Sequence, residues 1–298
     1  MPGMQTELQY ESPSDPGVAA RHRWLVDLLG IAGTGAAEPL ALADLGCGDG
    51  VTLEVLLERT GGLLVGVDAA EPALVEAATR LGRSARRGAA AGPAGHGRPG
   101  GRLGLLAADL TARLPLRDGS LDAALCHNVL ESLPDPDAFL VEVHRVLRPG
   151  GSLVLSHPDY DTMVFTAPDL ELTRRLVHAY CDTQQDWMSS VNGTIGRWLH
   201  DIAARSPFEV ELVTGSIVLS RGFRAPMLGY MFAHHVAEVL RRTGGFPDRV
   251  LDGWLDSLAE VDERGAFLWS INDYAVRCRK PAAAAPPQRR AGGGPASS

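Results

Sequence analysis

Three glycines at alternate positions constrain this chain more than any other feature. Residues 39–50 read Pro-Leu-Ala-Leu-Ala-Asp-Leu-Gly-Cys-Gly-Asp-Gly, and an apolar run over residues 51–57 follows immediately. Gly46, Gly48 and Gly50 permit backbone conformations and close approaches that other residues resist. The pattern predicts a buried strand that turns tightly into a helix, where backbone N–H groups and the helix N-terminus face a ligand. Its Gly-x-Gly-x-Gly spacing differs from the Gly-x-Gly-x-x-Gly of dinucleotide binders.

Further apolar runs end in polar residues. Leu63–Val67 ends in Asp68, about twenty residues after the glycine turn, which is the spacing of an acid that binds ribose hydroxyls. Leu103–Ala108 ends in Asp109, and Asn128 follows a fourth run that begins near residue 118. Carboxyl ends of parallel strands meet at one edge of a sheet, so these side chains are expected to share a nucleoside-binding edge.

This order of motifs resembles the class I S-adenosylmethionine (SAM)-dependent methyltransferases. Asp44–Gly50 matches the family's first motif, acid-x-Gly-x-Gly-x-Gly, and Arg145–Gly151 matches its Pro-Gly-Gly turn into the fifth strand. The resemblance is firm over residues 20–160. It implies an α/β fold with a Rossmann-like seven-stranded class I methyltransferase sheet, here with helical cap insertions, and it implies SAM as the cofactor.

The resemblance also implies which residues hold SAM. Asp68 would bind the ribose, Asp109 would lie beside the adenine amino group, and Asn128 would contact either the methionyl part of SAM or the acceptor. The family often covers SAM with an N-terminal segment, so either Arg21 or Arg23 would pair with the methionine carboxylate, or both lie on a solvated helix face. The expected cofactor-binding residues are Asp44, Gly46, Cys47, Gly48, Asp68, Ala69, Asp109, Leu110 and Asn128.

The charge of the chain argues against nucleic acid as a substrate. Its 28 Lys and Arg residues against 36 Asp and Glu residues give a formal net charge of −8, whereas nucleic-acid binding relies on concentrated positive charge. No apolar run approaches the roughly 20 residues that cross a bilayer, and residues 1–10 lack the layout of a signal peptide. We expect a cytoplasmic protein with no nucleic-acid or membrane partner.

The cysteines and the lysine of the chain bear on metal sites, disulfides and Schiff-base intermediates. The 4 cysteines are scattered without a Cys-x-x-Cys pair, which predicts neither a metal site nor a disulfide framework. They also fit poorly with an arsenite methyltransferase, which would need several convergent thiols. Lys280 is the only lysine and lies at the end of the last predicted strand, so Schiff-base chemistry is excluded.

Composition divides the chain into a domain and its flanks. Residues 83–101 and 281–298 are rich in Ala, Gly, Arg and Pro without periodicity, so we expect a disordered insertion and a disordered tail. Residues 1–18 are polar and turn-rich and are expected to form a flexible segment or a lid. The SAM-binding domain would then span residues 19–280, with early helices near 18–31 and 72–81.

The chain beyond residue 160 exceeds a minimal methyltransferase. Residues 209–220 and 267–279 have the pattern of strands. We assign Val210–Leu219 and Phe267–Cys278 to the antiparallel pair that closes the family's sheet. Helical spacing occurs within 160–205 and 226–260. These helices would be insertions that cap the carboxyl ends of the strands, where ligands bind in doubly wound folds.

Two C-terminal segments resemble a narrower group, the UbiE-like small-molecule methyltransferases. Ser156–Thr162 is similar to that group's exit from the fifth strand, and Gly265–Tyr274 is similar to its closing strand. The chain departs from the group by placing His157 and Pro158 ahead of Asp159, and a tyrosine where relatives have tryptophan. This departure leaves the substrate open.

Methyl transfer itself requires few side chains, because the sulfonium activates the methyl group and alignment of the nucleophile supplies much of the rate. A base matters when the acceptor must lose a proton. We expect His157, Asp159 and Asn272 to be catalytic and to face one cavity above the methyl group, walled by Tyr160 and Trp187. In the alternative interpretation, His157 is an ordinary hydrogen-bonded loop residue.

These observations predict a SAM-dependent methyltransferase that acts on O, N or C of a small-molecule acceptor, with secondary metabolism as one setting and a homodimer as one assembly. The same fold also serves SAM-binding enzymes with a different outcome, such as cyclisation, since a fold does not determine a reaction. A non-catalytic scaffold is the third alternative, disfavoured because the glycines, Asp68 and Asp109 are all present.

Overall fold

The computed structural model describes residues 15–31, 40–90, 102–189 and 193–282. Their strands form one 7-stranded sheet in the order β3-β2-β1-β4-β5-β7-β6. Neighbouring strands pair in parallel from β3 to β5, whereas β7 runs antiparallel to both β5 and β6. The predicted class I methyltransferase sheet and its closing antiparallel pair are confirmed. The strands are β1 (Ala41–Leu45), β2 (Leu63–Asp68), β3 (Arg102–Ala107), β4 (Leu121–His127), β5 (Leu147–Phe165), β6 (Glu209–Ser220) and β7 (Trp269–Arg279).

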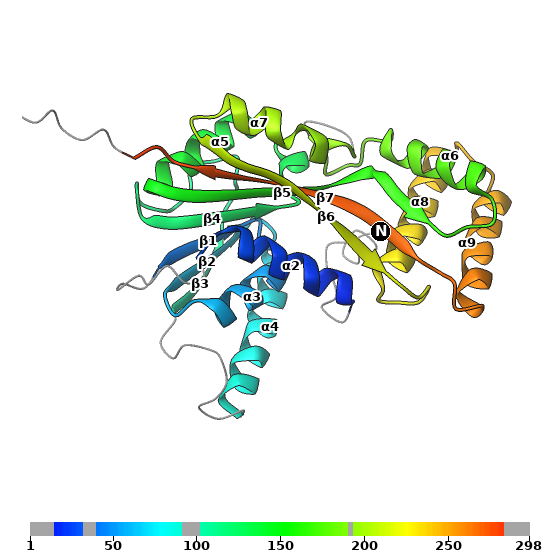
Figure 1. The fold of residues 1–298 in the computed structure, drawn as a ribbon, viewed down its shortest axis with the longest axis horizontal. Helices are drawn as coiled ribbons and strands as arrows, with labels where there is room; N and C mark the ends of the chain where they lie inside the picture. The colour runs from blue at the N-terminus through cyan, green and yellow to red at the C-terminus, as the bar shows by residue number, and fades with distance from the viewer. Residues whose placement is uncertain (1–14, 32–39, 91–101, 190–192, 283–298) are drawn as a thin grey trace, which may run out of the picture.

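Helices cover both faces of the sheet (Figure 1). One face packs against α2 (Pro16–Leu28), α3 (Val51–Arg59) and α4 (Glu71–Ala90) through a core of aliphatic side chains. The other face packs against α5 (Pro136–Val146), the 3-10 helix η2 (Ile195–Trp198) and α7 (Leu199–Arg205). These two layers place the carboxyl ends of β1, β2 and β4 at one open edge.

A separate group of helices lies beyond that edge, built on the long strands β5 and β7 (Figure 1). It contains α6 (Leu170–Cys181), α8 (Leu228–Thr243) and α9 (Asp248–Glu263). Phe165, Trp254 and Trp269 are fully buried in its core. The Trp254 indole donates to Thr173 Oγ1 over 3.1 Å and ties α9 to α6. We refer to α6, α8 and α9 as the cap.

The cap differs from the expected one in two respects. Residues 160–165 continue β5 and are not helical. Residues 195–205 lie over the sheet beside α5, because Ile195, Leu199 and Ile202 are buried in the core of that face. The insertion that covers the strand ends is therefore smaller than the sequence pattern suggested.

Two expected irregular segments are partly ordered. Helix α4 continues through residues 83–90, and Ser84 hydrogen-bonds to Glu54 of α3. Asp15 is buried and accepts hydrogen bonds from Gly17 N, Ser220 Oγ and Leu228 N, so it joins the start of α2 to β6 and α8. The expectations for residues 1–14, 91–101 and 283–298 lie outside the described residues. Within the described ranges, every helix is too short or too polar to span a bilayer.

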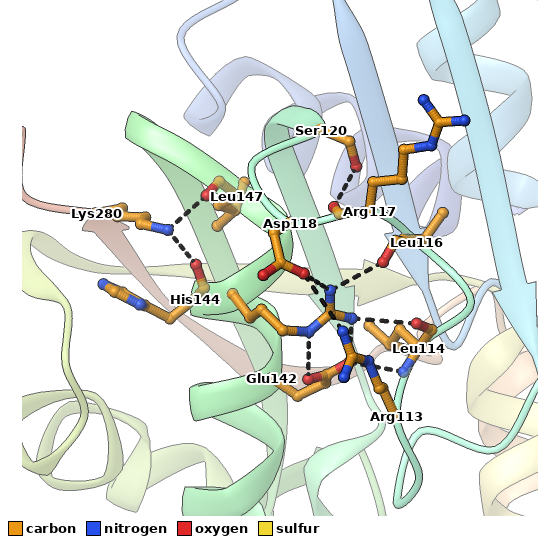
Figure 2. A network of polar contacts seen from close by, with 11 residues as sticks. Arg113, Leu114, Leu116, Arg117, Asp118, Ser120, Glu142, His144, Leu147 and Lys280 are labelled. Atoms are coloured by element: carbon orange, nitrogen blue, oxygen red, sulfur yellow. Dashed lines mark hydrogen bonds and ion pairs between the residues drawn. The ribbon is translucent and has the colours of Figure 1, made fainter.

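A polar network secures the opposite end of the sheet (Figure 2). Arg145 donates to the carbonyl oxygens of Leu114 and Leu116 at 3.1 and 2.9 Å and also binds Asp118 and Glu142. The ammonium group of Lys280 donates to the carbonyl oxygens of His144 and Leu147 at 2.6 and 2.7 Å. Lys280 thus caps the C-terminal end of α5, where a cation is favoured by the helix dipole.

Replacing Lys280 with methionine is expected to lower the free energy of unfolding by about 1–2 kcal/mol, because two charge-assisted hydrogen bonds to helix carbonyls are lost while the aliphatic stem remains. Urea denaturation measures the change. Arg113→Met is the matched control, since Arg113 is 75% exposed. Equal midpoints for the Lys280 variant and the wild-type protein would contradict the capping role.

Candidate functional site

The glycine turn after β1 has the geometry that its sequence predicted. Gly46, Gly48 and Gly50 have φ angles of +79°, +50° and +84°, a region where a non-glycine residue is strained. The N–H groups of Gly46 and Cys47 both donate to Val67 O, at 2.7 and 3.0 Å. A Cβ atom on Gly46 would lie 2.2 Å from a methyl carbon of Val129. The turn therefore needs glycine for both its conformation and its space.

Asp68 at the tip of β2 is fixed by the backbone on both sides. Its Oδ2 accepts from Gly48 N and its Oδ1 from Ala70 N, each at 2.8 Å. An ionised carboxylate has about four acceptor positions, so each oxygen retains capacity for a ligand hydroxyl. This arrangement holds the turn and presents the carboxylate to the cavity described next.

A cavity of about 620 Å³ lies at the carboxyl edge of the sheet. Asp44 lines this cavity. Burial and the neighbouring Asp68 raise its pKa to about 8. The Asp109 carboxylate accepts from the N–H and the hydroxyl of Thr111, and these bonds lower its pKa. The cavity is lined by every residue expected to bind the cofactor, namely Asp44, Gly46, Cys47, Gly48, Asp68, Ala69, Asp109, Leu110 and Asn128.

Helix α2 adds two residues to this half of the cavity. Arg21 is buried, and its Nε lies 3.0 Å from Oδ2 of the buried Asp273 of β7. His22 Nδ1 lies 2.9 Å from Thr52 Oγ1 in α3. Both residues line the cavity, whereas Arg23 is exposed. Of the two arginines considered from the sequence, Arg21 is therefore the one that lines the cavity.

The other half of the cavity is walled by apolar and aromatic side chains of β5 and the cap. Asn128, at φ +56°, connects the two halves, because its Oδ1 accepts from the Tyr160 hydroxyl at 3.1 Å. Tyr160 packs against Tyr180 and Phe232, with ring centroids 6.0 and 5.8 Å apart. The lining of this half is completed by Pro158, Trp187, Pro226, Leu228, Met231 and His235. Tyr160 and Trp187 are thus walls of the cavity, as expected.

His157, Asp159 and Asn272, the expected catalytic residues, do not line the cavity. The reason is that β5 does not end at Ser156 but continues to Phe165, and strand side chains alternate between faces. Pro158 and Tyr160 reach the cavity, whereas buried Asp159 forms a two-fold ion pair with Arg197 of η2, at 2.5 and 2.7 Å. Asn272 lies opposite Asp159 in the ladder.

Glu131 is the acidic residue that the sequence reasoning missed. It lies in the 3-10 helix η1 (Leu130–Ser132), is 3% exposed and lines the cavity. Burial raises its pKa to about 7, an effect opposed by a hydrogen bond from Trp187. Its Oε2 lies 3.6 Å from Nε2 of His157. The available signal was an acid within a mostly apolar loop, Val129–Leu133, shortly after the β4 tip.

Comparison with known families supports the assignment of the fold. The family model for the methyltransferase domain matches residues 43–155. The match covers less than half of the chain, and it agrees with the class I methyltransferase fold that the strand order shows. An uncharacterized 37.1 kDa protein in transposon TN4556 of Streptomyces fradiae is 33% identical over 241 residues, which cover 78% of this chain and 60% of that relative. The chain thus spans less than two thirds of the relative's length.

Solved structures agree on the fold. A Bacillus halodurans protein provisionally assigned as a methyltransferase superposes with a TM-score of 0.51 at 17% identity, covering 87% of this chain and 99% of that protein. The [4+2]-cyclase SpnF superposes with a TM-score of 0.50 at 18% identity, covering 89% of this chain and 82% of the cyclase. At these identities the likeness concerns the fold and not the reaction.

Proposed function

We propose that this protein transfers the methyl group of SAM to a small, apolar acceptor, as the narrower resemblance to UbiE-like methyltransferases suggests. One observation carries the proposal: a single cavity joins the residues expected to bind SAM to an aromatic wall supplied by β5 and the cap. Apolar pockets with a few convergent polar groups are typical small-molecule sites.

The residues of the first half fit SAM. The glycine turn leaves room for a close ligand, since a Cβ atom on Gly48 would meet no protein atom within 4 Å. Asp68 would accept from the ribose hydroxyls, and Arg21 would face the methionine carboxylate from α2. SAM, when bound, supplies a methyl group already activated by the sulfonium. The protein's part is then to orient the acceptor and to take its proton where one must leave.

Cyclisation is a second candidate function, because SpnF, a cyclase, has the same fold at a TM-score of 0.50. In that case SAM would occupy the same half of the cavity without losing its methyl group, and the aromatic half would fold a substrate for an internal ring closure. The two functions differ in one product, S-adenosylhomocysteine (SAH).

The proposal is tested with SAM that carries an isotope-labelled methyl group. The purified protein is first titrated with SAM and SAH by calorimetry, then incubated with labelled SAM and a small-molecule extract, and the products are identified by mass spectrometry. We expect binding of both ligands and matched formation of SAH and a labelled product. Binding without SAH, together with an unlabelled isomer of an extract component, would favour cyclisation. A protein that binds neither SAM nor SAH would contradict both functions.

A further inference from the structure

We propose that Glu131 accepts the proton of a hydroxyl group on the acceptor, that His157 positions Glu131 and stabilises its protonated form, and that the acceptor is a neutral, flat phenol or enol. The inference rests on the proposed function and names the substrate class of the same site. It assigns His157 a role through Glu131, although His157 itself does not line the cavity.

The Glu131 carboxylate has one hydrogen-bond donor and can accept from another. The Trp187 indole donates a hydrogen bond to it, while its Oε2 is buried and accepts no hydrogen bond from the described residues. A buried acceptor without a donor is costly, and Oε2 belongs to a residue of the cavity wall. A substrate hydroxyl in the cavity would supply the missing donor.

The contact between His157 and Glu131 requires one proton. His157 Nδ1 lies 2.7 Å from the carbonyl oxygen of Pro158, and because a carbonyl only accepts, Nδ1 carries the hydrogen. The Nε2 atom of the neutral ring is then an acceptor that faces Glu131 Oε2 at 3.6 Å. Two facing acceptors repel, so the pair is most stable with a proton on one of them. A small side-chain movement would bring them to hydrogen-bond distance, which is about 2.7–3.2 Å.

Burial decides which partner holds that proton. It lowers the pKa of His157 to about 4, with the Pro158 contact opposing and Arg21 adding to the shift, and it raises the pKa of Glu131 to about 7. Below about pH 7 the proton therefore resides on Glu131 and neutral His157 accepts from it, and above that pH Glu131 is ionised and can accept a proton from a substrate. Tyr180 of α6 and His235 of α8 are ionisable groups that line the same cavity. Burial raises the pKa of Tyr180 and lowers that of His235 to about 4.

The proposed step balances without a redox partner. The acceptor oxygen forms a bond to the methyl carbon while its proton passes to Glu131 Oε2. The carbon–sulfur bond breaks and its electron pair stays on sulfur. Glu131 then releases the proton to solvent before the next turnover. General bases are most effective with a pKa near the working pH, which Glu131 has.

The aromatic residues of the cavity indicate which class of substrate fits there. Tyr160, Tyr180, Trp187 and Phe232 offer ring faces that suit a flat apolar molecule. Arg21 is the only Lys or Arg among the described lining residues, and it pairs with Asp273, so the aromatic half has no cation for a carboxylate or phosphate. A near-neutral base matches the acidity of a phenol or enol better than that of an alkanol.

The test compares Glu131→Gln with the wild-type protein and with Glu58→Gln, a control at an exposed position of α3. SAM affinity is measured first, by calorimetry, and is expected to be equal in all three. Labelled methyl transfer is then followed with 2-naphthol, 4-nitrophenol, cyclohexanol and aniline. We expect transfer to the two phenols only, and a fall of about 10²-fold or more in Glu131→Gln.

The pH dependence separates a proton acceptor from a structural residue. Wild-type turnover should rise as the pH increases through about 7, since only ionised Glu131 accepts a proton. With 2-naphthol, which stays protonated throughout this pH range, the rise should be absent in Glu131→Gln. In His157→Gln the midpoint should move to lower pH, because the amide N–H of glutamine can donate to ionised Glu131, whereas Nε2 of neutral His157 can only accept.

A binding measurement gives a readout independent of turnover. The visible absorbance of 4-nitrophenol reports its ionisation. Bound to the SAH-loaded wild-type protein, it should ionise at a higher pH than when bound to Glu131→Gln, because the ionised Glu131 carboxylate disfavours a second negative charge beside it.

Unchanged turnover and pH profile in Glu131→Gln would overturn the role of Glu131. Should that variant not fold, the His157→Gln profile decides. Transfer to aniline alone, or a wild-type protein that binds SAM yet neither binds nor methylates the phenols, would overturn the substrate class. A wild-type protein that does not bind SAM would instead contradict the proposed function.

Discussion

Replacing Arg21 with methionine is expected to lower the free energy of unfolding by about 3–5 kcal/mol, the usual cost of removing one partner of a buried ion pair. Arg21 and Asp273 have side chains that are 3% and 0% exposed, and Ser156 Oγ donates to Asp273 Oδ1 at 2.8 Å. The substitution leaves the carboxylate buried with its cation gone. Urea denaturation measures the change.

Two further variants make this result interpretable. Arg23→Met removes an exposed arginine from the same helix and should leave the denaturation midpoint unchanged. Asp273→Asn combined with Arg21→Met removes both charges and should recover a large part of the loss, since no uncompensated charge remains. A loss below about 1 kcal/mol in Arg21→Met alone would show that the pair is not a structural link between α2 and β7.

Asp68→Ala is expected to weaken SAM binding by about 1.5–3 kcal/mol, or roughly 10- to 150-fold, because hydrogen bonds to an ionised group are lost. The change also removes the acceptor of Gly48 N and Ala70 N, which loosens the turn that lies beside the ligand. Calorimetry measures the affinity, and the thermal midpoint shows that the variant is folded. Glu71→Gln, at the exposed position that begins α4, is the control. A folded Asp68→Ala protein with wild-type affinity would show that SAM does not bind at this edge.

The half of the cavity that we propose holds SAM could be located from the sequence because its determinants are local. Each of Gly46, Asp68 and Asp109 lies at the tip of a strand whose apolar pattern is plain in the sequence. Parallel pairing then brings these tips together without further information. The structure accordingly places all of the expected cofactor residues on one cavity.

The acceptor half could not be predicted, since it depends on contacts between distant segments. The resemblance placed the exit from the fifth strand at Ser156–Thr162, whereas β5 continues to Phe165. The last pairing of β4 with β5 is His127 with Ser156, so at Pro158 the strand pairs only with β7, on one side, where a residue without a ladder donor is tolerated. Because of this continuation, Pro158 lines the cavity and His157, which was expected to, does not. Likewise, nothing local distinguishes buried Arg21 from exposed Arg23.

The pairing of β7 with β5 and β6 bears on how molecules reach the acceptor half. The β5–β7 ladder runs from Ser152 and Arg279 to Phe165 and Trp269 with a break between Asp159 and Val164, and β6 stays paired with β7 as far as Ser220 and Trp269. A cap joined by loops alone can swing open about a hinge. A cap whose base is a paired ladder can swing only by giving up backbone hydrogen bonds. We therefore expect the rim of the cavity to act as a fixed aperture, so that admission depends on molecular cross-section and not on a closing motion.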